Sequence, residues 1–483
     1  MTALHFEDAT ELARRVRDGE CSSLELTDHY IDRIERLDGE VNAVVVRDFE
    51  RAREAARAAD ARQAAGESLG PLHGVPFTIK ESYNATGLPT TWGFPQLRDN
   101  IATEDAHAVA RYREAGAVLL GKTNVPIALG DFQSYNEIYG TTGNPWDVTR
   151  TPGGSSGGSA AAMVAGFSGF ESGSDIGSSI RNPAHFCGVY GHKPTWGIFP
   201  PQGQSLPGQV APTDLAVCGP MARSARDLRQ LMDVASGAQP LNARGWRLEL
   251  PAADKRSLSD YRVAIWATDE RAPVSDEVQQ RAIATGELLS KLGATVSDVA
   301  RPDYDITLGH RAYLGLLNSV TGARLPPEAR GRLIQIAQEA DPDDHSQRVE
   351  SARGMTLSHA DWLASNGVRE HMRYAWRDFF GDWDILIAPQ MATTAFEHDH
   401  APFGKRTLGV DGEQRPYFDA LFWAGIATAP YLPSTVFPTG LAADGLPIGL
   451  QAIGAEYTDR LTIDFTRLLA EELGGCVYPD AFA

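Results

Sequence analysis

The stretch over residues 70–219 is dense in Gly, Ser, Thr and Pro, and short apolar runs interrupt it. Residues 74–80 predict a buried strand with Lys80 at its end, and residues 117–120 predict a second strand. Between these two runs, residues 104–114 have the pattern of a helix. Because strands that alternate with helices are typical of α/β proteins, we expect an α/β fold.

Helical patterns flank this stretch on both sides. Residues 1–65 predict helices, since Ser22-x-x-Glu25 fits a capping box and residues 48–65 are rich in Ala and Arg. The segment 301–380 is mainly helical and polar. The other predicted elements are helices over 276–292 and 458–473 and strands over 261–266, 385–389, 433–438 and 448–453. No charged or Pro-rich linker separates these elements, so we expect one compact unit over residues 1–483.

The charge and the cysteines exclude several classes of protein. The 483-residue chain has 44 Lys and Arg against 63 Asp and Glu, a net charge of −19, which argues against general nucleic-acid binding. Its four cysteines are too scattered for a disulfide framework or a Cys-x-x-Cys metal site. The N-terminal residues lack the apolar segment of a signal peptide, and no run approaches about 18 apolar residues. We therefore expect a cytoplasmic protein with reduced thiols and no membrane segment.

Residues 116–123 match the phosphate-loop pattern G-x-x-x-x-G-K-[ST] but lack its context. That loop needs a strand before the first glycine and a helix after the last residue. Here helical residues precede Gly116, the intervening residues are strand-like, and Pro126 lies where the helix would run. We therefore reject nucleotide binding at this motif.

Residues 154–158 match G-x-S-x-G around Ser156, the pattern of a nucleophile elbow. An elbow follows a strand, whereas residues 149–154 do not have a strand pattern. His185 and His192 lie nearby in the sequence, but an isolated histidine is more often structural than catalytic. The Ser-His-Asp interpretation is therefore the weaker one.

Three segments together carry a more specific pattern. They are residues 74–80, TPGGSSGGS over 151–159, and GSDIGSSIRNPAHFCG over 173–188. On these residues the chain resembles the amidase signature hydrolases, and the resemblance covers most of the chain. It implies a single large α/β fold with a central mixed β-sheet covered by helices on both faces. It is strongest over residues 70–230, which would form the signature core.

The resemblance implies a Ser-Ser-Lys triad. Lys80 matches the family lysine, Ser155 the bridging serine and Ser179 the nucleophile, and the Gly154-Ser155 bond is expected to be cis. Elementary chemistry supports these roles, because a serine hydroxyl attacks only when a base takes its proton. Lysine is such a base only when it is neutral, which burial at the end of an apolar strand favours. The Ser155 hydroxyl both accepts and donates, so it can relay the proton.

The Gly-rich turn that contains Ser179 can point successive backbone N–H groups at one position, as an oxyanion hole requires. The expected donors are the N–H groups of Ile176, Gly177, Ser178 and Ser179. Asp175 and Arg181 flank this turn, and we expect them to form a structural ion pair. The chain departs from the family pattern twice, with Ser178 in place of a glycine and Glu81 in place of an aspartate. A side chain at position 178 restricts φ, so the geometry of the oxyanion hole or the room for substrate can differ.

The leading hypothesis is an amidase that hydrolyses a carboxylic amide to acid and amine through a seryl acyl-enzyme, with esters, anilides or carbamates as further small-molecule substrates. An alternative is the A-type subunit of a glutamyl/aspartyl-tRNA amidotransferase, which works with a partner. It is disfavoured because the chain lacks a Ser-Leu-Asp-Gln stretch around residues 213–217. A binding protein with an inactive site is a third hypothesis, and the intact triad residues argue against it.

Family position suggests four residues for the substrate pocket, Tyr135, Ile176, Phe199 and Trp423, with core packing as the equal alternative for each. The variable helical segment 301–380 could cap the site. No cofactor and no metal is expected, since His398-x-His400 is too small a set of ligands. A homodimer is common in the family, although no sequence feature specifies the oligomeric state.

Overall fold

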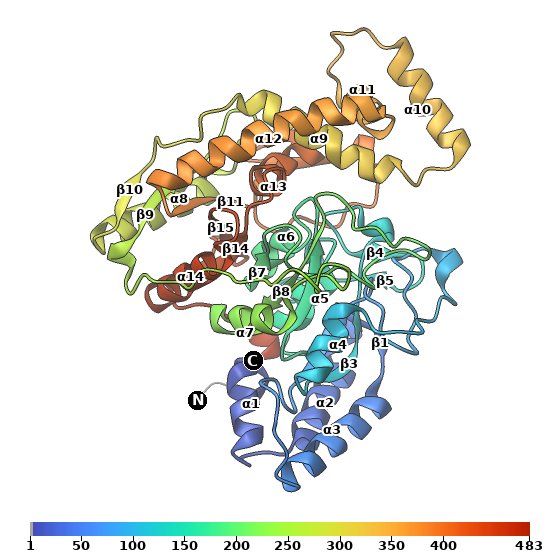
Figure 1. Ribbon diagram of the computed structural model, residues 1–483, viewed down its shortest axis with the longest axis vertical. Coiled ribbons are helices and arrows are strands. Elements are labelled where there is room, and N and C mark those ends of the chain that lie inside the picture. Colours follow the sequence, from blue (N-terminus) through green and yellow to red (C-terminus); the bar gives the residue numbers. More distant parts are fainter. Residues whose placement is uncertain (1–2) are drawn as a thin grey trace.

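The computed structural model describes residues 3–483, and its largest sheet has eight strands (Figure 1). In chain order these strands are β6 (Glu171–Asp175), β7 (Tyr190–Lys193), β8 (Val217–Ala222), β9 (Arg262–Ile265), β10 (Thr295–Ser297), β11 (Ile385–Pro389), β14 (Ser434–Leu441) and β15 (Pro447–Ile453). Their order across the sheet is β10-β9-β11-β15-β14-β7-β8-β6. The pairs β10–β9 and β9–β11 are parallel and the other pairs are antiparallel, so the sheet is mixed, as expected.

A second, three-stranded sheet carries Lys80. It consists of β1 (Val44–Arg47), β2 (Pro76–Lys80) and β3 (Val118–Thr123) in the order β1-β3-β2. Its edge strand β2 lies against β6, the edge strand of the large sheet, and Thr78 Oγ1 donates to Glu171 Oε1 at 2.7 Å across this contact. The predicted strand that ends at Lys80 is confirmed, but it lies outside the eight-stranded sheet.

Fourteen α-helices complete the described part of the chain. They are α1 (Ala9–Arg17), α2 (Ser23–Val41), α3 (Phe49–Ala64), α4 (His107–Glu114), α5 (Gly157–Val164), α6 (Arg181–Cys187), α7 (Ala225–Ala235), α8 (Asp276–Lys291), α9 (Ile306–Gly322), α10 (Pro327–Glu339), α11 (Gln347–Met355), α12 (His359–Asp382), α13 (Leu421–Thr428) and α14 (Asp459–Leu473). Two hairpins, β4 (Tyr135–Asn136) with β5 (Gly140–Thr141) and β12 (Thr407–Val410) with β13 (Glu413–Pro416), lie outside both sheets. Helices α1–α3 and α9–α12 lie at opposite ends of the molecule (Figure 1).

Alternation along β11 shows that helices cover both faces of the large sheet. Ile385 and Ile387 belong to a buried cluster with side chains of α8 and α14, whereas Leu386 and Ala388 belong to a second cluster with α9, α12 and α13. Successive side chains of a strand point to opposite faces, so these two clusters lie on the two sides of the sheet. The expected arrangement of a mixed sheet between helical layers is confirmed.

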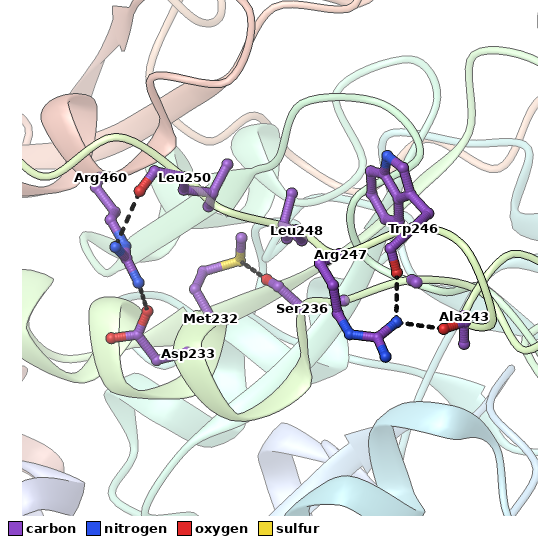
Figure 2. Close-up of a pocket in the computed structure, with 11 residues that line it drawn as sticks. Met232, Asp233, Ser236, Ala243, Trp246, Arg247, Leu248, Leu250 and Arg460 are labelled. Atoms are coloured by element: carbon purple, nitrogen blue, oxygen red, sulfur yellow. Dashed lines mark hydrogen bonds and ion pairs between the residues drawn. The ribbon is translucent and has the colours of Figure 1, made fainter.

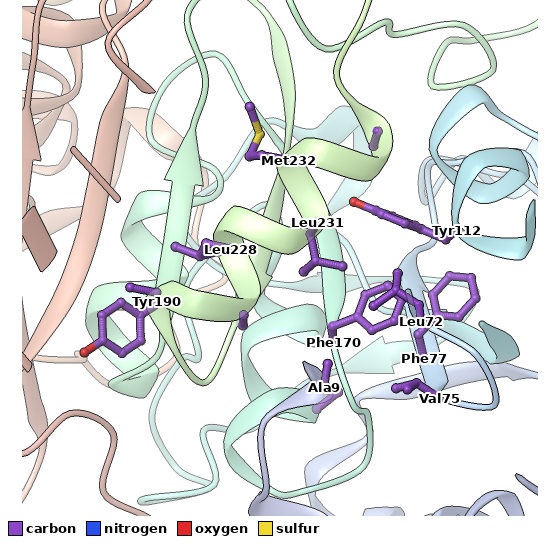
Figure 3. Packing of buried hydrophobic residues seen from close by; sticks show 14 of the residues in the cluster. Ala9, Leu72, Val75, Phe77, Tyr112, Phe170, Tyr190, Leu228, Leu231 and Met232 are labelled. Atoms are coloured by element: carbon purple, nitrogen blue, oxygen red, sulfur yellow. The ribbon is translucent and has the colours of Figure 1, made fainter. Parts of the chain in front are cut away.

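Aromatic packing fixes the strand that ends at Lys80. Phe77 of β2 stacks on Phe170 with ring centroids 4.8 Å apart, and Tyr112 meets Phe170 edge-on at 5.0 Å (Figure 3). All three rings are fully buried. Offset-stacked and edge-on aromatic pairs stabilise a core beyond the area that they bury. The apolar residues of β2 therefore hold Lys80 at a defined place in the interior.

Most predicted elements agree with the structure, with small shifts at their ends. The Ser22 capping box is present, with the Ser22 hydroxyl and the Glu25 carboxylate each accepting from the other's backbone N–H. The helical prediction for residues 1–65 missed β1, a strand of four residues, and its residues 1–2 lie outside the described part.

Lys122 and Thr123 of the phosphate-loop match lie within β3, so these residues form a strand and not a loop. In the described chain, no helix has the length and apolar character to cross a bilayer.

Candidate active site

Lys80 is fully buried, and its ammonium group contacts a set of hydroxyls. Its Nζ lies 2.7 Å from Ser155 Oγ, 2.9 Å from Ser156 Oγ and 3.0 Å from Ser174 Oγ. All of these partners are neutral groups. The lysine is therefore held by hydrogen bonds, without a carboxylate in direct contact.

Burial changes the proton affinity of this lysine. Desolvation of the charged form lowers the pKa of Lys80 to about 7, although Asp175, Cys218 and Glu171 act in the opposite direction. A lysine with such a pKa is substantially neutral in a neutral solution, so it can accept a proton from a hydroxyl.

The loop before α5 presents Ser155 to Lys80. The Gly154-Ser155 peptide bond is cis, as expected. Gly154 packs so closely on the segment before Tyr135 that a Cβ at position 154 would lie 2.4 Å from Asp131 O. The Gly154 N–H donates to Asn182 Oδ1 at 3.0 Å, which ties this loop to α6. A glycine is required here because the backbones of the two segments approach within contact distance.

The turn that follows β6 brings Ser179 beside this loop. The Ser156 N–H donates to the Ser179 carbonyl oxygen at 3.0 Å, so the two segments are joined through the backbone. Ser179 is 7% exposed, whereas Ser155 is 1% exposed. Within residues 3–483, Ser179 Oγ makes no hydrogen bond, so its hydroxyl is free. The structure thus brings the three predicted residues into one cluster without a direct bond between the Ser155 and Ser179 hydroxyls.

Asp175 and Arg181 form the expected ion pair, with Asp175 Oδ1 3.0 Å from Arg181 Nη2 and both side chains fully buried. Burial raises the pKa of Asp175, but the Arg181 guanidinium outweighs this effect and the net pKa lies below its ordinary value. The same carboxylate also accepts the N–H groups of Ser178 at 2.9 Å and Ile180 at 3.1 Å. The bond to Ser178 corrects the expected set of oxyanion donors, because the Ser178 N–H is already engaged by Asp175.

Two residues of the cluster, Ser174 and Gln390, were missed in the sequence, and Ser156 was considered only as a nucleophile. Ser156 and Ser174 share Lys80 with Ser155, and Ser174 is the direct neighbour of Asp175. Gln390 follows β11 directly, and its Nε2 donates to Ser178 Oγ. A polar side chain at the end of an apolar strand is the signal that could have pointed to it, because the carboxyl ends of strands often carry functional groups.

Two of the expected pocket residues belong to the core. Phe199 is 3% exposed and lies in the cluster that contains Phe77, and Trp423 is 0% exposed with its Nε1 donating to Ala272 O at 2.9 Å. Both rings pack among apolar side chains, and Trp423 also lines a small cavity, so their place in the substrate pocket stays a prediction. Tyr135 is half-buried, and its hydroxyl accepts from Arg406 Nη2 at 2.7 Å.

The helical segment 301–380 contacts the turn that contains Ser179. Tyr313 of α9 donates from its hydroxyl to the Ile176 carbonyl oxygen at 3.1 Å. A Cβ at Gly177 would lie 3.1 Å from Leu421, so this glycine lets the turn approach the apolar side chains beside α9. Helix α9 therefore packs directly against the backbone of the turn.

Two cavities in the described part of the chain are not lined by Lys80, Ser155 or Ser179. A cavity of about 470 Å³ is lined by the end of α7, residues 243–250 and Arg460, and it contains none of Lys80, Ser155 and Ser179 (Figure 2). A second cavity, of about 370 Å³, is lined mainly by residues 201–213. It reaches the lysine indirectly, because the lining residue Gln204 donates to Ser174 Oγ at 3.1 Å.

The histidines do not form a second catalytic arrangement with Ser156. His185 contacts Gly449 and Thr393 through both ring nitrogens, and His192 contacts Thr435 and Asp459. Both rings are occupied in the core, so the structure gives no support to a Ser156–His pair. The part of the chain that the structure describes contains no group of three or more His, Cys, Asp or Glu placed to hold a metal ion.

The chain is similar to known proteins over most of its length. The family model described as Amidase matches residues 25–463. An acylamidase of Rhodococcus erythropolis is 32% identical over 473 residues, which cover 95% of this chain and 94% of that protein. The A-type subunit of the glutamyl-tRNA(Gln) amidotransferase of Moorella thermoacetica is 34% identical over 487 residues, 94% of each chain. The crystal structure of a bacterial aryl acylamidase has a TM-score of 0.81 at 26% identity and covers 97% of this chain and 96% of its own.

Proposed function

The chain belongs to the amidase family, and on that premise we propose that it hydrolyses a carboxylic amide to acid and amine through a seryl acyl-enzyme. One observation carries the proposal. A buried lysine with a lowered pKa lies 2.7 Å from the Ser155 hydroxyl, and the backbone of the next residue, Ser156, is hydrogen-bonded to the carbonyl oxygen of Ser179. In this arrangement Lys80 is the base, Ser155 the relay and Ser179 the nucleophile.

The reaction takes two acyl-transfer steps. Ser179 Oγ attacks the carbonyl carbon while its proton passes to Ser155, and the Ser155 proton passes to Lys80 Nζ. The C–N bond then breaks, the amine nitrogen takes a proton back along the same route, and Ser179 keeps the acyl group as an ester. Water then attacks the carbonyl carbon of this ester and gives a proton to Lys80 through Ser155. The bond between the acyl carbon and Ser179 Oγ breaks, Ser179 takes the proton back along the same route, and the acid leaves.

Backbone N–H groups would stabilise the negative charge on the carbonyl oxygen during both steps. The groups of Ile176, Gly177 and Ser179 remain for this task, since the Ser178 N–H donates to Asp175. The Asp175–Arg181 pair supports the turn from within the core. Tyr313 would cap the site by holding the Ile176 carbonyl from the side of α9.

The function is tested by incubating the purified chain alone with acyl 4-nitroanilides and with 4-nitrophenyl esters of the same acyl groups. We expect release of the chromogenic amine and of one acid per amine, because the mechanism needs no cofactor. Carbamates and esters would react by the same steps, since each presents a carbonyl to Ser179. Hydrolysis of esters with no turnover of any amide in the series would contradict the proposal.

The amidotransferase alternative keeps some support, because several similar relatives are A-type subunits of glutamyl-tRNA(Gln) amidotransferases. Those relatives are parts of an assembly, so this role would require a partner. The chain has Thr213-Asp214-Leu215-Ala216-Val217 where an amidotransferase of this type is expected to have Ser-Leu-Asp-Gln. Turnover of anilides by the isolated chain favours the amidase, whereas glutamine hydrolysis that appears only with a co-purified partner favours the alternative.

The pH dependence of kcat/KM follows from the pKa of Lys80. Below pH 7 the lysine is increasingly protonated and cannot accept the serine proton, so we expect kcat/KM to rise with pH and to be half-maximal near pH 7. The profile is measured with an acyl anilide that does not itself ionise between pH 5 and pH 9. A profile that stays flat over this range would argue against a lysine base.

A further inference from the structure

Ser178 has a backbone conformation that is unusual for its residue type. Its φ is +88°, in the left-handed region that glycine adopts freely and that a Cβ disfavours. The residue is fully buried and lies between Gly177 and Ser179, two of the proposed oxyanion donors. The direction of the Ser179 N–H depends on the conformation of Ser178, because the peptide that carries this N–H begins at its carbonyl carbon. Something must therefore hold Ser178 in this conformation.

Three hydrogen bonds hold Ser178 in place. Its N–H donates to Asp175 Oδ1 at 2.9 Å, and its carbonyl oxygen accepts from the Asn182 N–H at 2.7 Å. Its hydroxyl oxygen accepts from Gln390 Nε2. The first two bonds are local to the turn and to α6. The third comes from a residue more than two hundred positions away in the sequence, on another element.

Gln390 reaches the turn from a rigid part of the molecule. It follows Pro389, the last residue of β11, and this strand is paired on one side with β9 and on the other with β15. The Gln390 side chain is fully buried, and within residues 3–483 its Oε1 has no hydrogen-bond partner. The bond to Ser178 is therefore the one hydrogen bond that fixes the Gln390 amide. Loss of the Ser178 hydroxyl would leave this buried amide without any partner, which is costly.

We propose that Gln390 is a positioning residue that holds Ser178 in its left-handed conformation and so keeps the N–H groups of Gly177 and Ser179 directed at the reacting carbonyl. The inference rests on the proposed amide hydrolysis, which it deepens. Gln390 acts through Ser178 and does not itself touch the substrate. Its effect is expected on the chemical steps, because the oxyanion forms only there.

Three variants test the proposal with acyl anilide hydrolysis. Ser178→Ala removes the hydroxyl but keeps the Cβ, so the turn loses its tether while φ stays disfavoured, and we expect kcat to fall at least ten-fold with KM changed less than three-fold. Ser178→Gly removes the same hydroxyl, but glycine adopts this φ freely, so kcat should stay within three-fold of wild type. Gln390→Met keeps the side-chain volume and should match Ser178→Ala.

A double variant separates positioning from general packing. In the Ser178→Gly background, Gln390→Met should change kcat less than two-fold, because no side chain remains to be held. Equal losses of kcat in the two backgrounds, or equal activities of Ser178→Ala and Ser178→Gly, would overturn the proposal. If Gln390→Met does not fold, the comparison of kcat between Ser178→Ala and Ser178→Gly alone tests the proposal.

Labelling of Ser179 by a phosphonofluoridate, measured by mass spectrometry of the intact protein, distinguishes a failure of this inference from a failure of the proposed function. In that reaction the Ser179 oxygen bonds to phosphorus, fluoride leaves and the serine proton passes to the base, while the phosphoryl oxygen occupies the oxyanion position. We expect labelling of Ser178→Ala and Gln390→Met to be at least ten-fold slower than that of wild type. Absence of labelling in wild type would contradict the proposed function itself, whereas wild-type labelling with unchanged rates in both variants would contradict only the role of Gln390.

Discussion

Replacement of Ser179 by alanine is expected to lower kcat for acyl anilides by at least about 10⁴-fold, because no other hydroxyl is presented to the substrate in the same way. The change should leave the fold intact. Ser179 Oγ makes no hydrogen bond within residues 3–483, so its removal breaks no internal contact, and the residue is among the few members of the cluster with measurable exposure. The measurement is the rate of amine release at saturating substrate, with thermal melting to verify folding.

A buried serine of the neighbouring strand provides the matched control. Ser172 lies in β6, and its hydroxyl donates to Gly219 O at 3.2 Å. Ser172→Ala should keep kcat within about three-fold, because this hydroxyl lies outside the proposed relay. Full activity of a folded Ser179→Ala protein would overturn the assignment of the nucleophile and would redirect attention to Ser156.

Replacement of Lys80 by methionine is expected to lower kcat by about 10³-fold above pH 7, where the lysine of the wild type is mainly neutral, because the base is lost while the apolar stem is kept. Its Nζ holds the hydroxyls of Ser155, Ser156 and Ser174. Without it the Ser155 hydroxyl has no acceptor for its proton, so the relay stops at its last step. The rise of kcat/KM near pH 7 should also disappear from the profile of this variant.

Lys122 provides a matched control for the replacement of Lys80. It is also fully buried, burial lowers its pKa to about 8, and it lies opposite Ile79 in the neighbouring parallel strand. Its ammonium group contacts Pro89 O and Thr90 Oγ1 and none of the proposed catalytic hydroxyls. Lys122→Met should therefore lower thermal stability while kcat stays within a few-fold. Equal loss of kcat in the two folded variants would mean that the effect of Lys80 is structural.

Much of the fold could be predicted because apolar runs of four to eight residues identify buried strands. The run before Lys80 and the runs that became β11, β14 and β15 were found in this way. The strand β1 was missed because Val44–Arg47 is short and lies between two strongly helical segments. That Lys80 belongs to a separate sheet could not be predicted, since periodicity within a strand says nothing about which strand pairs with it.

The site contains local contacts, which the sequence indicates, and contacts between distant segments, which it does not indicate. The Asp175–Arg181 pair is confirmed, and it lies within seven residues of the sequence. The contacts of Gln390 and Tyr313 with the turn join segments far apart in the chain, and no local pattern announces them. The engagement of the Ser178 N–H by Asp175 depends on the detailed path of the turn. For Phe199 and Trp423, an aromatic residue at a family position is compatible with core and pocket alike, and the structure shows both rings buried.

The division of the site between two sheets has a consequence for how the protein gains activity as it folds. Lys80 ends a strand of the three-stranded sheet, and Ser179 follows a strand of the eight-stranded sheet. Neither sheet alone contains both groups, and β2 and β6 lie in contact without a shared ladder of backbone bonds. Recovery of activity during refolding therefore reports the docking of the two sheets, and not the formation of either one.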